Sequence, residues 1–567
     1  MQEWRVYSKK ADFDRLSARF GIDPVVARII RNRNLTEDSQ FEMYLNGTAA
    51  DMYDPNLMKD MGAAVSMLSD AVRKGDRIRI IGDYDIDGIC SIYILFMGLK
   101  KIGADVDYDI PDRITDGYGI NRRIIDDAHN AGVKLILTCD NGIAAYDEIE
   151  YAEGLGIKVI VTDHHDIPFE ESDGVKKYRI PNAHAVVNPK QADCPYPFDR
   201  LCGAGIAYKY MQAMGVSDED MLCFAAIATV GDIVDLVDEN RIIVKEGLKC
   251  IAHTANKGLL AIISACGLDK SSISSFHIGF VIGPCMNASG RLDTAKKALR
   301  MFLTEDDKEA GRIAVELIEL NDIRKKLTSK AVEQAEELIE NSDLKDDRVL
   351  VVYIKDCHES IAGIVAGRIR EKYYRPTIVL CDGEDGIKGS ARSIEGYNMF
   401  LGLCGCREYL TRFGGHPMAA GLSLPADNYQ PFRKAINEQC TLTDSDMVEK
   451  IWIDVPMPIE YVNEKLIDEL KLLEPFGKAN EKPVFADKNL IISRVRAMGK
   501  EGQYTSLELT KNSGARIRAV GFFPPEELTE AFLANKRVSC TYYPQINTFR
   551  GENYLQICVT GYKIENI

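Results

Sequence analysis

The sequence lacks any hydrophobic run long enough to cross a membrane, since nothing in it approaches about 18 consecutive apolar residues. Its first ten residues, MQEWRVYSKK, contain neither the basic region nor the apolar region of a secretory signal. The 15 cysteines include no CxxC pair, and most of them stand in apolar runs, as small buried hydrophobic residues do. We therefore expect a cytoplasmic protein that is neither secreted nor inserted in a membrane.

Positive charge is also in deficit, because 70 Lys and Arg face 86 Asp and Glu, which gives a formal net charge of −16. This balance argues against a protein whose whole surface coats nucleic acid, but it leaves room for a local basic groove. A dinucleotide-dependent redox enzyme lacks support, since the segment GDYDIDG at 82–88 has no GxGxxG phosphate turn. With 567 residues, 46% of them hydrophobic, the chain can form about three or four domains.

Helix-like and strand-like stretches alternate from about residue 60 to 240, which predicts βαβ units and a parallel sheet. The segment 304–340 has no proline and keeps apolar residues at helical spacing, so we expect a long connecting helix. A second α/β unit and then a strand-rich unit with the turn signals of a small barrel follow it. The predicted parts are an N-terminal segment 1–60, a parallel-sheet domain 61–303, the connecting helix 304–345, an α/β domain 346–447 and a barrel 448–567.

Three aspartates follow a buried-strand pattern at intervals of two residues. Asp83, Asp85 and Asp87 stand directly after IRIIG, and the alternation places their side chains on one face. Carboxylates crowded in this way repel one another at neutral pH, and a divalent cation is the usual relief. The spacing therefore predicts a metal site.

Polar residues also end the next strands of the predicted sheet. Asp140 and Asn141 follow one strand, and Asp163, His164 and His165 follow another. Ligands of parallel sheets collect beyond the carboxyl ends of the strands, so we expect these side chains to share one site with the three aspartates. Asp232, at the end of another apolar stretch, is added to this set. Oxygen and imidazole ligands without thiolates favour two Mn²⁺ or Mg²⁺ ions, which can activate a water for phosphoryl displacement.

Four motifs follow one another in a recognisable order: DYDIDG at 83–88, LILTCDNG at 135–142, DHH at 163–165 and TVGD at 229–232. Together they resemble the motifs of the DHH phosphoesterase superfamily. Further segments are similar to those of its bacterial single-stranded-DNA-specific exonucleases: PDRITDGYG at 111–119, CGAGIAYK at 202–209, GPCMNASGRL at 283–292, GSARSIEGYN at 389–398, FGGHPMAAGLS at 413–423 and LEPFGKANEKPVF at 473–485. The resemblance implies an α/β fold, in which a long helix joins a parallel-sheet DHH domain to a second α/β domain, DHHA1. A C-terminal OB-fold-like β-barrel completes the implied architecture.

The resemblance also implies how the metal ligands divide. Asp140 bridges the two ions, Asp83 and Asp85 bind one of them, and the remaining ligands bind the other: Asp87, His164 and Asp232. His165 is a candidate catalytic residue whose role stays open between a ligand, a phosphate contact and an orienting group. For Asp163, capping of the local turn competes with any role in catalysis.

The substrate contacts implied by the resemblance lie in the later motifs. A pocket for the 5′ phosphate and the first nucleotides would be formed by Arg113, Arg291, Ser390 and Arg392, with Asn287 beside it. The turn Gly414, Gly415 and His416 would let the backbone approach phosphate, and His358 would face the site from a helix start. Two positions depart from the family pattern: Cys285 replaces a usual arginine, and Cys357-His358-Glu359-Ser360 keeps only the histidine of WHPG.

Arginines alternate with aromatic residues in the C-terminal part, a mixture that can follow a phosphate backbone and stack bases. The residues concerned are Arg494, Arg496, Arg516, Arg518, Arg537, Tyr504, Phe522, Phe523 and Tyr542. For each aromatic residue, a place in the core of a small barrel is the competing interpretation.

The resemblance implies a processive exonuclease that cuts single-stranded DNA from the 5′ end to mononucleotides in recombination and repair. Two alternatives remain: a DHH-family phosphodiesterase of short oligonucleotides or cyclic dinucleotides, and an inactive clamp that binds single-stranded DNA. A single-strand-binding protein and a RecQ-type helicase are the implied partners. We expect a monomer, because the implied ring of domains closes within one chain.

Overall fold

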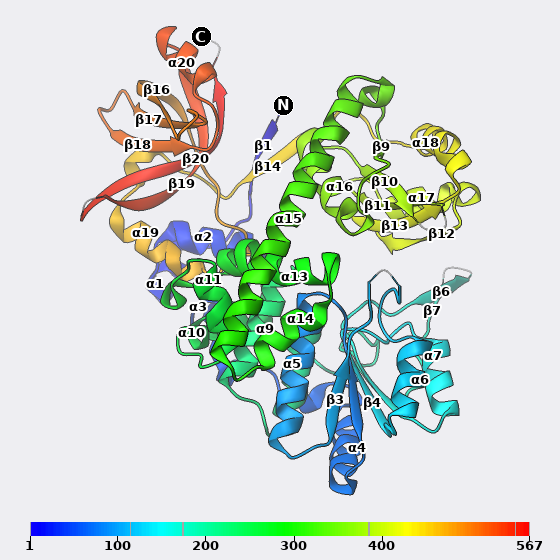
Figure 1. The fold of residues 1–567 in the computed structure, drawn as a ribbon. Coiled ribbons are helices and arrows are strands. Elements are labelled where there is room, and N and C mark those ends of the chain that lie inside the picture. The colour runs from blue at the N-terminus through cyan, green and yellow to red at the C-terminus, as the bar shows by residue number, and fades with distance from the viewer. Residues whose placement is uncertain (1, 114, 173–174, 384–385, 550, 566–567) are drawn as a thin grey trace.

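The structure is a computed structural model that describes residues 2–113, 115–172, 175–383, 386–549 and 551–565. Figure 1 shows a parallel sheet with its helices at the bottom, a helical layer in the centre, and one long helix that rises to a second α/β unit. The β-barrel lies on the opposite side of the long helix from that unit. No helix in the described part of the chain has the length and apolar character that a membrane span requires.

The first large sheet has five parallel strands in the order β3-β2-β4-β5-β8. Their bounds are β2 Ile78–Ile81, β3 Val106–Asp109, β4 Leu135–Cys139, β5 Lys158–Thr162 and β8 Ala185–Val187. Every residue of β4 is buried, as a central strand covered on both faces requires. Because all five strands run in the same direction, the residues that follow β2, β4 and β5 meet at one edge.

Helices cover both faces of this sheet. Alternate residues of the strands pack against α5 and α8 on one face and against α6 and α7 on the other. The helices of this unit are α4 Met61–Lys74, α5 Ile86–Lys101, α6 Arg122–Asn130, α7 Tyr146–Gly154 and α8 Gly203–Ala213. A small hairpin, β6 Phe169–Ser172 and β7 Val175–Tyr178, projects from the loops after β5.

A helical layer follows and continues the same hydrophobic core. Its members are α9 Glu219–Gly231, α10 Asp238–Ile251, α11 Lys257–Ala265, α12 Ser275–His277, a π-helical turn Ile278–Ile282, α13 Gly283–Leu292 and α14 Ala295–Leu303. The expected connecting helix is α15, Asp307–Glu340, whose N-terminus is capped by Asp306. Its 34 residues span about 50 Å, enough to join two separate cores.

The second sheet has the order β12-β13-β11-β10-β9, in which β9 and β10 are parallel and the other pairs antiparallel. Its strands are β9 Leu350–Tyr353, β10 Thr377–Gly383, β11 Gly386–Arg392, β12 Arg412–His416 and β13 Ala419–Leu424. The helices α16 Glu359–Tyr373, α17 Met399–Gly405 and α18 Tyr429–Glu438 pack on it.

The C-terminal strands form a closed barrel, because β19 pairs with both β20 and β16. The order is β16-β17-β18-β20-β19, with β15 beside β16. Bounds here are β15 Val455–Pro456, α19 Glu464–Leu470, β16 Phe485–Met498, β17 Tyr504–Thr510, β18 Arg516–Gly521, α20 Glu526–Leu533, β19 Arg537–Phe549 and β20 Glu552–Ile564. The predicted fold class, two α/β units joined by a long helix and followed by an OB-like barrel, is therefore confirmed.

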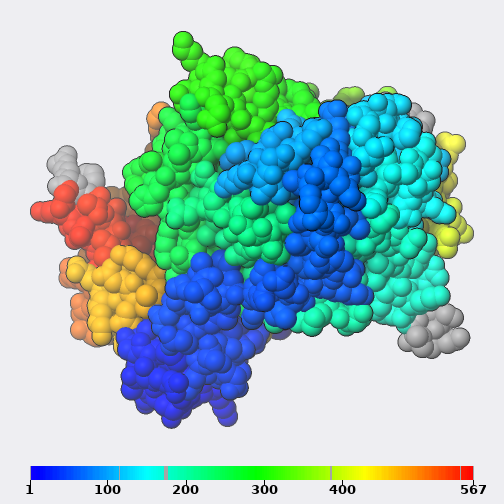
Figure 2. All heavy atoms as spheres, turned by 90° about the horizontal axis from the view of Figure 1, so that it is seen from below, coloured from blue at the N-terminus to red at the C-terminus, as the bar shows by residue number. Residues whose placement is uncertain are grey.

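The N-terminal part folds onto the C-terminal part. The helices α1 Phe13–Phe20, α2 Pro24–Asn32 and α3 Asp38–Asn46 contribute to the same hydrophobic core as the barrel. The strand β1 Gln2–Val6 pairs in parallel with β14 Glu449–Ile453. Figure 2 shows the dark blue N-terminal segment in contact with the yellow-orange segment that precedes the barrel. The division at residues 60, 303, 345 and 447 stays a prediction.

One buried arginine joins these parts to the helical layer. Arg241 on α10 donates from Nε to the carbonyl oxygen of Tyr44 at 3.0 Å, and its guanidinium lies 3.9 Å from the Tyr44 ring centroid. The Nη1 and Nη2 atoms of Arg241 donate to the carbonyl oxygens of Leu473 and Leu472 at 3.0 and 2.9 Å. The planar donor fork of Arg241 thus ties both α3 and the segment before the barrel to α10.

Replacing Arg241 by lysine should destabilise the protein, because one ammonium group cannot supply these separated donors and leaves buried carbonyl oxygens unpaired. We expect Arg241→Lys to lower the free energy of unfolding by roughly 2–4 kcal/mol. Thermal and denaturant unfolding measure this loss. Arg516→Lys, at an exposed position of the barrel, is the matched control and should change stability little. Equal stability of the two variants would contradict the role of Arg241.

Candidate metal centre

The loop after β2 places two carboxylates at the start of α5. Asp85 caps this helix, since its Oδ1 accepts from the N–H groups of Asp87 and Gly88 at 2.9 and 3.1 Å. Asp83 is buried in the same loop. A Cβ on Gly88 would lie 2.2 Å from the carbonyl oxygen of Asp83, so only glycine lets the helix start this close to the loop.

Asp87 lies in the first turn of α5 and points at the N-terminus of α8. Its Oδ2 and Oδ1 accept from the N–H groups of Gly203 and Ala204, both at 2.7 Å. The positive end of a helix dipole stabilises a carboxylate in this place. The CGAG segment therefore fixes the orientation of an aspartate more than one hundred residues earlier in the chain.

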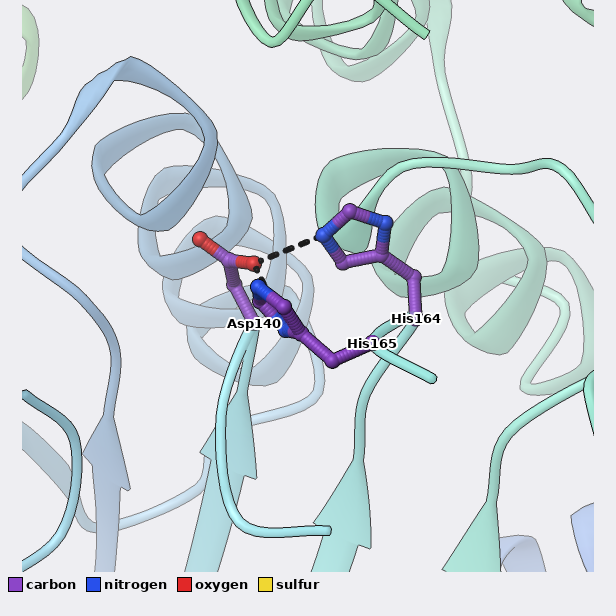
Figure 3. A group of neighbouring side chains, drawn as sticks. All are labelled: Asp140, His164 and His165. Atoms are coloured by element: carbon purple, nitrogen blue, oxygen red, sulfur yellow. Dashed lines mark ion pairs between the residues drawn. The ribbon is translucent and has the colours of Figure 1, made fainter. Parts of the chain in front are cut away.

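The segments after β4 and β5 bring an aspartate and two histidines together. Asp140 has a φ of 61°, the left-handed region that a short polar residue tolerates at a sharp turn. Its Oδ1 lies 3.1 Å from Nε2 of His164 and 3.9 Å from Nδ1 of His165. Figure 3 shows both imidazole rings directed at the Asp140 carboxylate from the end of the neighbouring strand.

The predicted ligands form groups of the size that holds a metal ion. In each group the potential ligand atoms lie within 4.8 Å of one another. One group is Asp83, Asp85 and Asp140, a second is Asp87, His164 and Asp232, and a third joins Asp140 to His164 and His165. The first two groups coincide with the division that the resemblance implies, and Asp140 connects them through His164. The assignment of each residue as a ligand stays a prediction.

Burial and mutual repulsion disfavour negative charge in this cluster. Both effects raise the pKa of Asp87 to about 7, where Asp85 supplies the neighbouring charge. Burial and neighbouring carboxylates also raise the pKa values of Asp83, Asp140 and Asp232 well above the ordinary range. Oδ1 of Asp83 is buried and has no hydrogen-bond partner among the described residues. A group of oxygen and imidazole donors with an unpaired carboxylate oxygen fits hard divalent cations.

Asp163 orients the two histidines instead of joining the ligand groups. Its Oδ1 accepts from the backbone N–H of His164 at 2.7 Å and lies 2.8 Å from Nδ1 of His165. Its Oδ2 accepts from the N–H of Ile143. Burial alone would raise the pKa of Asp163, but the bond from His165 and its positive charge lower it to about 2. The local capping interpretation of Asp163 is thus the one that its hydrogen bonds support.

The two adjacent histidines differ in charge. Burial and the nearby His165 lower the pKa of His164 to about 3, so its imidazole is neutral, as a metal ligand must be. Burial would also lower the pKa of His165, but the bond to Asp163 raises it to about 9. The Tyr118 hydroxyl donates to the carbonyl oxygen of Asp140 at 2.6 Å and lies 3.2 Å from Nδ1 of His165.

The side chain of Asn141, which follows Asp140, forms hydrogen bonds with backbone groups. Its Nδ2 donates to the carbonyl oxygens of Ile81 and Cys139 at 3.0 and 2.9 Å, and its Oδ1 accepts from the N–H of Ile120 at 3.2 Å. These bonds tie the ends of β2 and β4 to the loop that carries Tyr118. The amide of Asn141 is therefore committed to holding the strand ends in register.

The predicted phosphate-binding arginines gather beside the aspartate loop. Tyr84, Arg113, Ser360 and Ser390 line a cavity of about 250 Å³ between the first sheet and the second α/β unit. The guanidinium of Arg113 lies 4.8 Å from the Tyr84 ring centroid. The positive charges repel one another, since burial and then the charge of Arg113 lower the pKa of Arg291 to about 10.

Arg291 and Arg392 reach this region from opposite domains. Nη1 of Arg291, on α13, donates to the carbonyl oxygen of Ser360 at the start of α16. Burial and nearby guanidinium groups, Arg113 among them, lower the pKa of Arg392. The arrangement concentrates positive charge in a partly buried pocket, as a terminal phosphate requires.

Two predicted substrate residues have structural contacts of their own. Oδ1 of Asn287 accepts from the N–H of Ile86 at 2.9 Å and so holds α13 against the start of α5. His358 caps α16, where its Nδ1 lies 2.8 Å from the Ser360 hydroxyl and accepts from the Ser360 N–H. Both residues therefore position the elements that surround the site, and their contact with substrate stays a prediction.

The glycine turn lies on the edge strand β12, with Gly414, Gly415 and His416 exposed. A Cβ on Gly415 would lie 2.4 Å from the carbonyl oxygen of Ala419, so the close pairing of β12 with β13 requires glycine there. Nδ1 of His416 is 3.9 Å from Oδ2 of Asp166, which follows the two histidines. The turn thus contacts the loop that follows His164 and His165, where the two α/β units meet.

Cys285 faces the interior of the helical layer. It is buried, its Sγ lies 3.2 Å from the carbonyl oxygen of Val281, and it accepts from Nδ2 of Asn321 on α15 at 3.4 Å. The cysteine at this position therefore contributes to the packing of α13 against α15.

The aromatic residues of the barrel divide between core and surface. Tyr542 is fully buried and donates to the carbonyl oxygen of Met457, and Phe523 packs against Tyr562. Tyr504 and Phe522 are exposed and lie edge to face. The core interpretation applies to the first pair, and the second pair remains available for stacking.

Two aromatic residues inside the motifs contribute to the site although the sequence patterns do not predict this. Tyr118, in the DGYG segment, supports Asp140 and His165, and Tyr84, between two ligand aspartates, contacts Arg113. Their positions within motifs were the available signal. A phenol ring carries no charge at neutral pH, so charge patterning gives no sign that Tyr84 contacts Arg113 or that Tyr118 supports Asp140.

The fold and the acidic centre define the class of this protein. The chain matches the DHH family, N-terminal domain, over residues 77–231 and the DHHA1 domain over residues 346–442. It also matches the RecJ OB domain over residues 453–561. These matches cover the parallel sheet, the second sheet and the barrel.

Full-length relatives narrow the class further. The chain is 36% identical over 549 residues to the single-stranded-DNA-specific exonuclease RecJ of Bacillus subtilis, covering 96% of this chain and 68% of that protein. It is 31% identical over 578 residues to RecJ of Escherichia coli, with 95% of each covered. The chain therefore belongs to the RecJ family.

Solved structures agree with this placement. RecJ from Thermus thermophilus in complex with Mn²⁺ has a TM-score of 0.82 and 26% identity, covering 100% of this chain and 80% of that one. A second structure of that protein contains Mg²⁺ and has a TM-score of 0.77 and 25% identity.

Without metal, the protein should lose stability as the pH rises from about 5 to 8. A carboxyl group with a raised pKa binds more protons in the folded than in the unfolded state, so stability falls as the pH rises toward the folded pKa. Asp87, with a pKa of about 7, titrates in this window, and the raised pKa of His165 acts in the same direction. The unfolding temperature in the presence of a chelator measures the effect, and Mn²⁺ should reverse it most strongly at the higher pH.

Asp140→Asn provides the matched control, because it removes one buried charge at nearly constant volume. Its metal-free form should be roughly 1–3 kcal/mol more stable than the native protein at pH 8, with a weaker response to Mn²⁺. If the metal-free native protein were equally stable at pH 5 and at pH 8, this result would contradict the repulsion among these carboxylates.

Proposed function

We propose that this chain is a metal-dependent exonuclease specific for single-stranded DNA, which acts in DNA recombination and repair. The observation that carries the proposal is the adjacency of two possible ligand groups, connected by Asp140 and His164, to a cavity lined by Arg113, near which the buried Arg291 and Arg392 lie. Its relatives over nearly the whole chain are single-stranded-DNA-specific exonucleases. The proposal thus combines groups that would bind a metal pair with groups that would bind a chain end.

The donor set fits two divalent cations, Mn²⁺ or Mg²⁺. Asp83 and Asp85 would hold one ion and Asp87, His164 and Asp232 the other, with Asp140 between them. Bound there, the ions would activate a water and stabilise the oxygens of an in-line phosphoryl displacement. The raised pKa values of the carboxyl groups are the cost of keeping this site assembled without metal.

The remaining residues of the site orient the substrate. Arg113, Arg291 and Arg392, with Ser390, would hold the terminal phosphate through charge-assisted hydrogen bonds. His165, held by Asp163 and Tyr118 beside Asp140, would donate a hydrogen bond to the scissile phosphate. We choose this role for His165 because its side chain is partly exposed, while its backbone N–H and its Nδ1 atom are already bound to Asp163.

We propose 5′ to 3′ polarity and mononucleotide products. The cavity of about 250 Å³ that Arg113 and Tyr84 line is small and adjoins the loop of Asp83 and Asp85. Its size suits a single terminal nucleotide and its phosphate. A strand bound with its 5′ phosphate there would present the next phosphodiester to the metal centre. The long helix and the barrel would hold the rest of the strand, since short oligonucleotides need neither.

A strand labelled at its 5′ or 3′ end tests this function directly. In the presence of Mn²⁺, the native protein should release the 5′ label early as a mononucleotide. Asp140→Asn should lower the rate by about a thousandfold or more, because the residue proposed to lie between the two ions loses its negative charge. Asp193→Asn, an exposed aspartate paired with Lys59, is the control and should keep the native rate.

Other outcomes would identify the alternatives. Tight binding of the strand without cleavage would indicate the inactive clamp. Cleavage confined to very short oligonucleotides or cyclic dinucleotides would indicate the other phosphodiesterase class. Early loss of the 3′ label would reverse the proposed polarity while leaving the metal-dependent hydrolysis in place.

Arg113→Ala should weaken recognition of the 5′ phosphate and leave the metal centre assembled. We expect KM for a 5′-phosphorylated strand to rise by about ten- to a hundredfold, with a much smaller effect on a strand that ends in a 5′ hydroxyl. Arg122→Ala is the matched control, because Arg122 is an exposed arginine on α6 that lies over the Tyr151 ring of α7. An equal loss on both strands would show that Arg113 does not read the terminal phosphate.

The setting of the reaction is also a proposal. A monomer would suffice, because the N-terminal and C-terminal parts close on each other within one chain. A single-strand-binding protein and a RecQ-type helicase are proposed partners, since both act where single strands form. Cytoplasmic localisation is consistent with the 15 unpaired cysteines.

A further inference from the structure

Two cysteine thiols meet in the helical layer, apart from the predicted metal ligands. Cys285 lies on α13, and Cys266 follows the last residue of α11. Their thiols share a hydrogen bond in which Cys285 is the donor. Both helices pack against α15, where Nδ2 of Asn321 donates to the sulfur of Cys285 at 3.4 Å. The long helix therefore helps to bring together two cysteines that come from different helices.

The surroundings of this pair favour a thiolate on Cys266. The hydrogen bond from Cys285 lowers the pKa of the Cys266 thiol, burial opposes this effect, and the charge of Lys325 on α15 adds to it. Cys266 is only partly buried, so a small molecule can reach its sulfur. A cysteine with a lowered pKa, a nearby cation and partial exposure is the kind that reacts with oxidants.

A second pair of neighbouring thiols, Cys223 on α9 and Cys250 on α10, lacks these surroundings. Burial raises the pKa of both cysteines, and the carboxylates of Glu219 and Glu246 raise the pKa of Cys250 further. A neutral thiol is a much weaker nucleophile than a thiolate. The contrast identifies Cys266 and Cys285 as the more reactive pair.

The helix that carries Cys285 also supports the aspartate loop after β2. Oδ1 of Asn287, in the same turn of α13 as Cys285, accepts from the N–H of Ile86 at 2.9 Å. A Cβ on Gly290 would lie 2.2 Å from the carbonyl oxygen of Tyr84, so α13 is in close contact with this loop. A displacement of α13 must therefore be passed on to the predicted metal ligands of the loop.

We propose that Cys266 and Cys285 form a site of reversible oxidation, at which a peroxide converts the two thiols to a disulfide and thereby slows the nuclease. The effect on activity rests on the proposed function, whereas the disulfide is independent of it. Disulfides of proteins in a reducing compartment are usually transient and sense oxidants. Cys285 stands where the family pattern has an arginine, so a relative that keeps the arginine cannot form this bond.

The oxidation proceeds in two steps. The Cys266 thiolate attacks one oxygen of hydrogen peroxide, the O–O bond breaks, and the other oxygen leaves as hydroxide and is protonated to water. The sulfur of Cys285 then attacks the sulfenic acid on Cys266, the S–S bond forms, and the departing hydroxide takes the proton of Cys285. Two thiols and one peroxide give one disulfide and two waters, so both sulfurs are oxidised and both peroxide oxygens are reduced.

The disulfide changes the contacts of α13. An S–S bond of about 2.05 Å is much shorter than a hydrogen bond between two thiols, so the sulfur of Cys285 must move toward Cys266. Cys285 also loses the proton that it directs at the carbonyl oxygen of Val281. Because α13 supports the aspartate loop, we expect weaker metal binding and slower cleavage in the oxidised protein.

Peptide mapping of the oxidised protein tests the disulfide directly. The full chain is treated with hydrogen peroxide, the peroxide is removed, and the protein is digested without a reductant. Mass spectrometry should find the peptides of Cys266 and Cys285 joined, with the mass of two hydrogens lost. Treatment with dithiothreitol should separate them again.

Cleavage of a single strand provides the second measurement. With Mn²⁺ added, the oxidised native protein should cleave about tenfold more slowly than the reduced protein, and dithiothreitol should restore the rate. Cys266→Ser should keep the native rate before oxidation and lose the response to peroxide. Cys250→Ser removes a thiol of the other pair and is the matched control, which should respond as the native protein does.

The two measurements separate the possible failures. If peroxide left Cys266 and Cys285 unjoined, or joined Cys223 to Cys250 instead, the oxidation site would be overturned. A disulfide at the proposed place with an unchanged rate would overturn the control of activity through α13. A protein that forms the disulfide but cuts no strand in either state would contradict the proposed function and leave the oxidation site in place.

Discussion

The fold has to overcome the repulsion among buried carboxylates at one edge of a parallel sheet, and the surrounding elements are arranged to do so. Burial raises the pKa values of Asp83, Asp140 and Asp232, so the folded chain holds these groups where they are least stable without a counter-charge. Backbone groups provide part of the compensation, through the cap at Asp85 and the helix terminus that faces Asp87. Because these contacts come from α5 and α8, the sheet and its helices serve to keep the carboxylates together.

Much of the architecture could be predicted from the sequence. The alternation of helices and apolar strands indicates the parallel sheet, and the ligands at strand ends follow because the carboxyl ends of parallel strands share one edge. The periodicity of 304–340 predicts α15, which begins three residues later than expected. These features can be predicted because the local spacing of residues determines them, and the rest of the fold only has to be compatible with them.

Contacts between distant segments could not be predicted in the same way. The bond from Asn287 to Ile86 and the packing of Cys285 against Asn321 depend on how α13 is placed by the whole helical layer. The same holds for Tyr118, whose hydroxyl reaches two residues from other loops. Residue type and neighbours in the chain carry no signal for such contacts, and an amide in a motif can serve either backbone or substrate.

The shared core of the N-terminal helices and the barrel has a consequence for folding during translation. Leu16, Val26 and Phe41 emerge from the ribosome first, yet their partners, such as Leu466 and Phe485, come more than four hundred residues later. At about 5–20 residues per second, the first helices wait tens of seconds for the surface that covers them. During translation they expose apolar faces, so the synthesis of this protein places a demand on chaperones that its finished structure conceals.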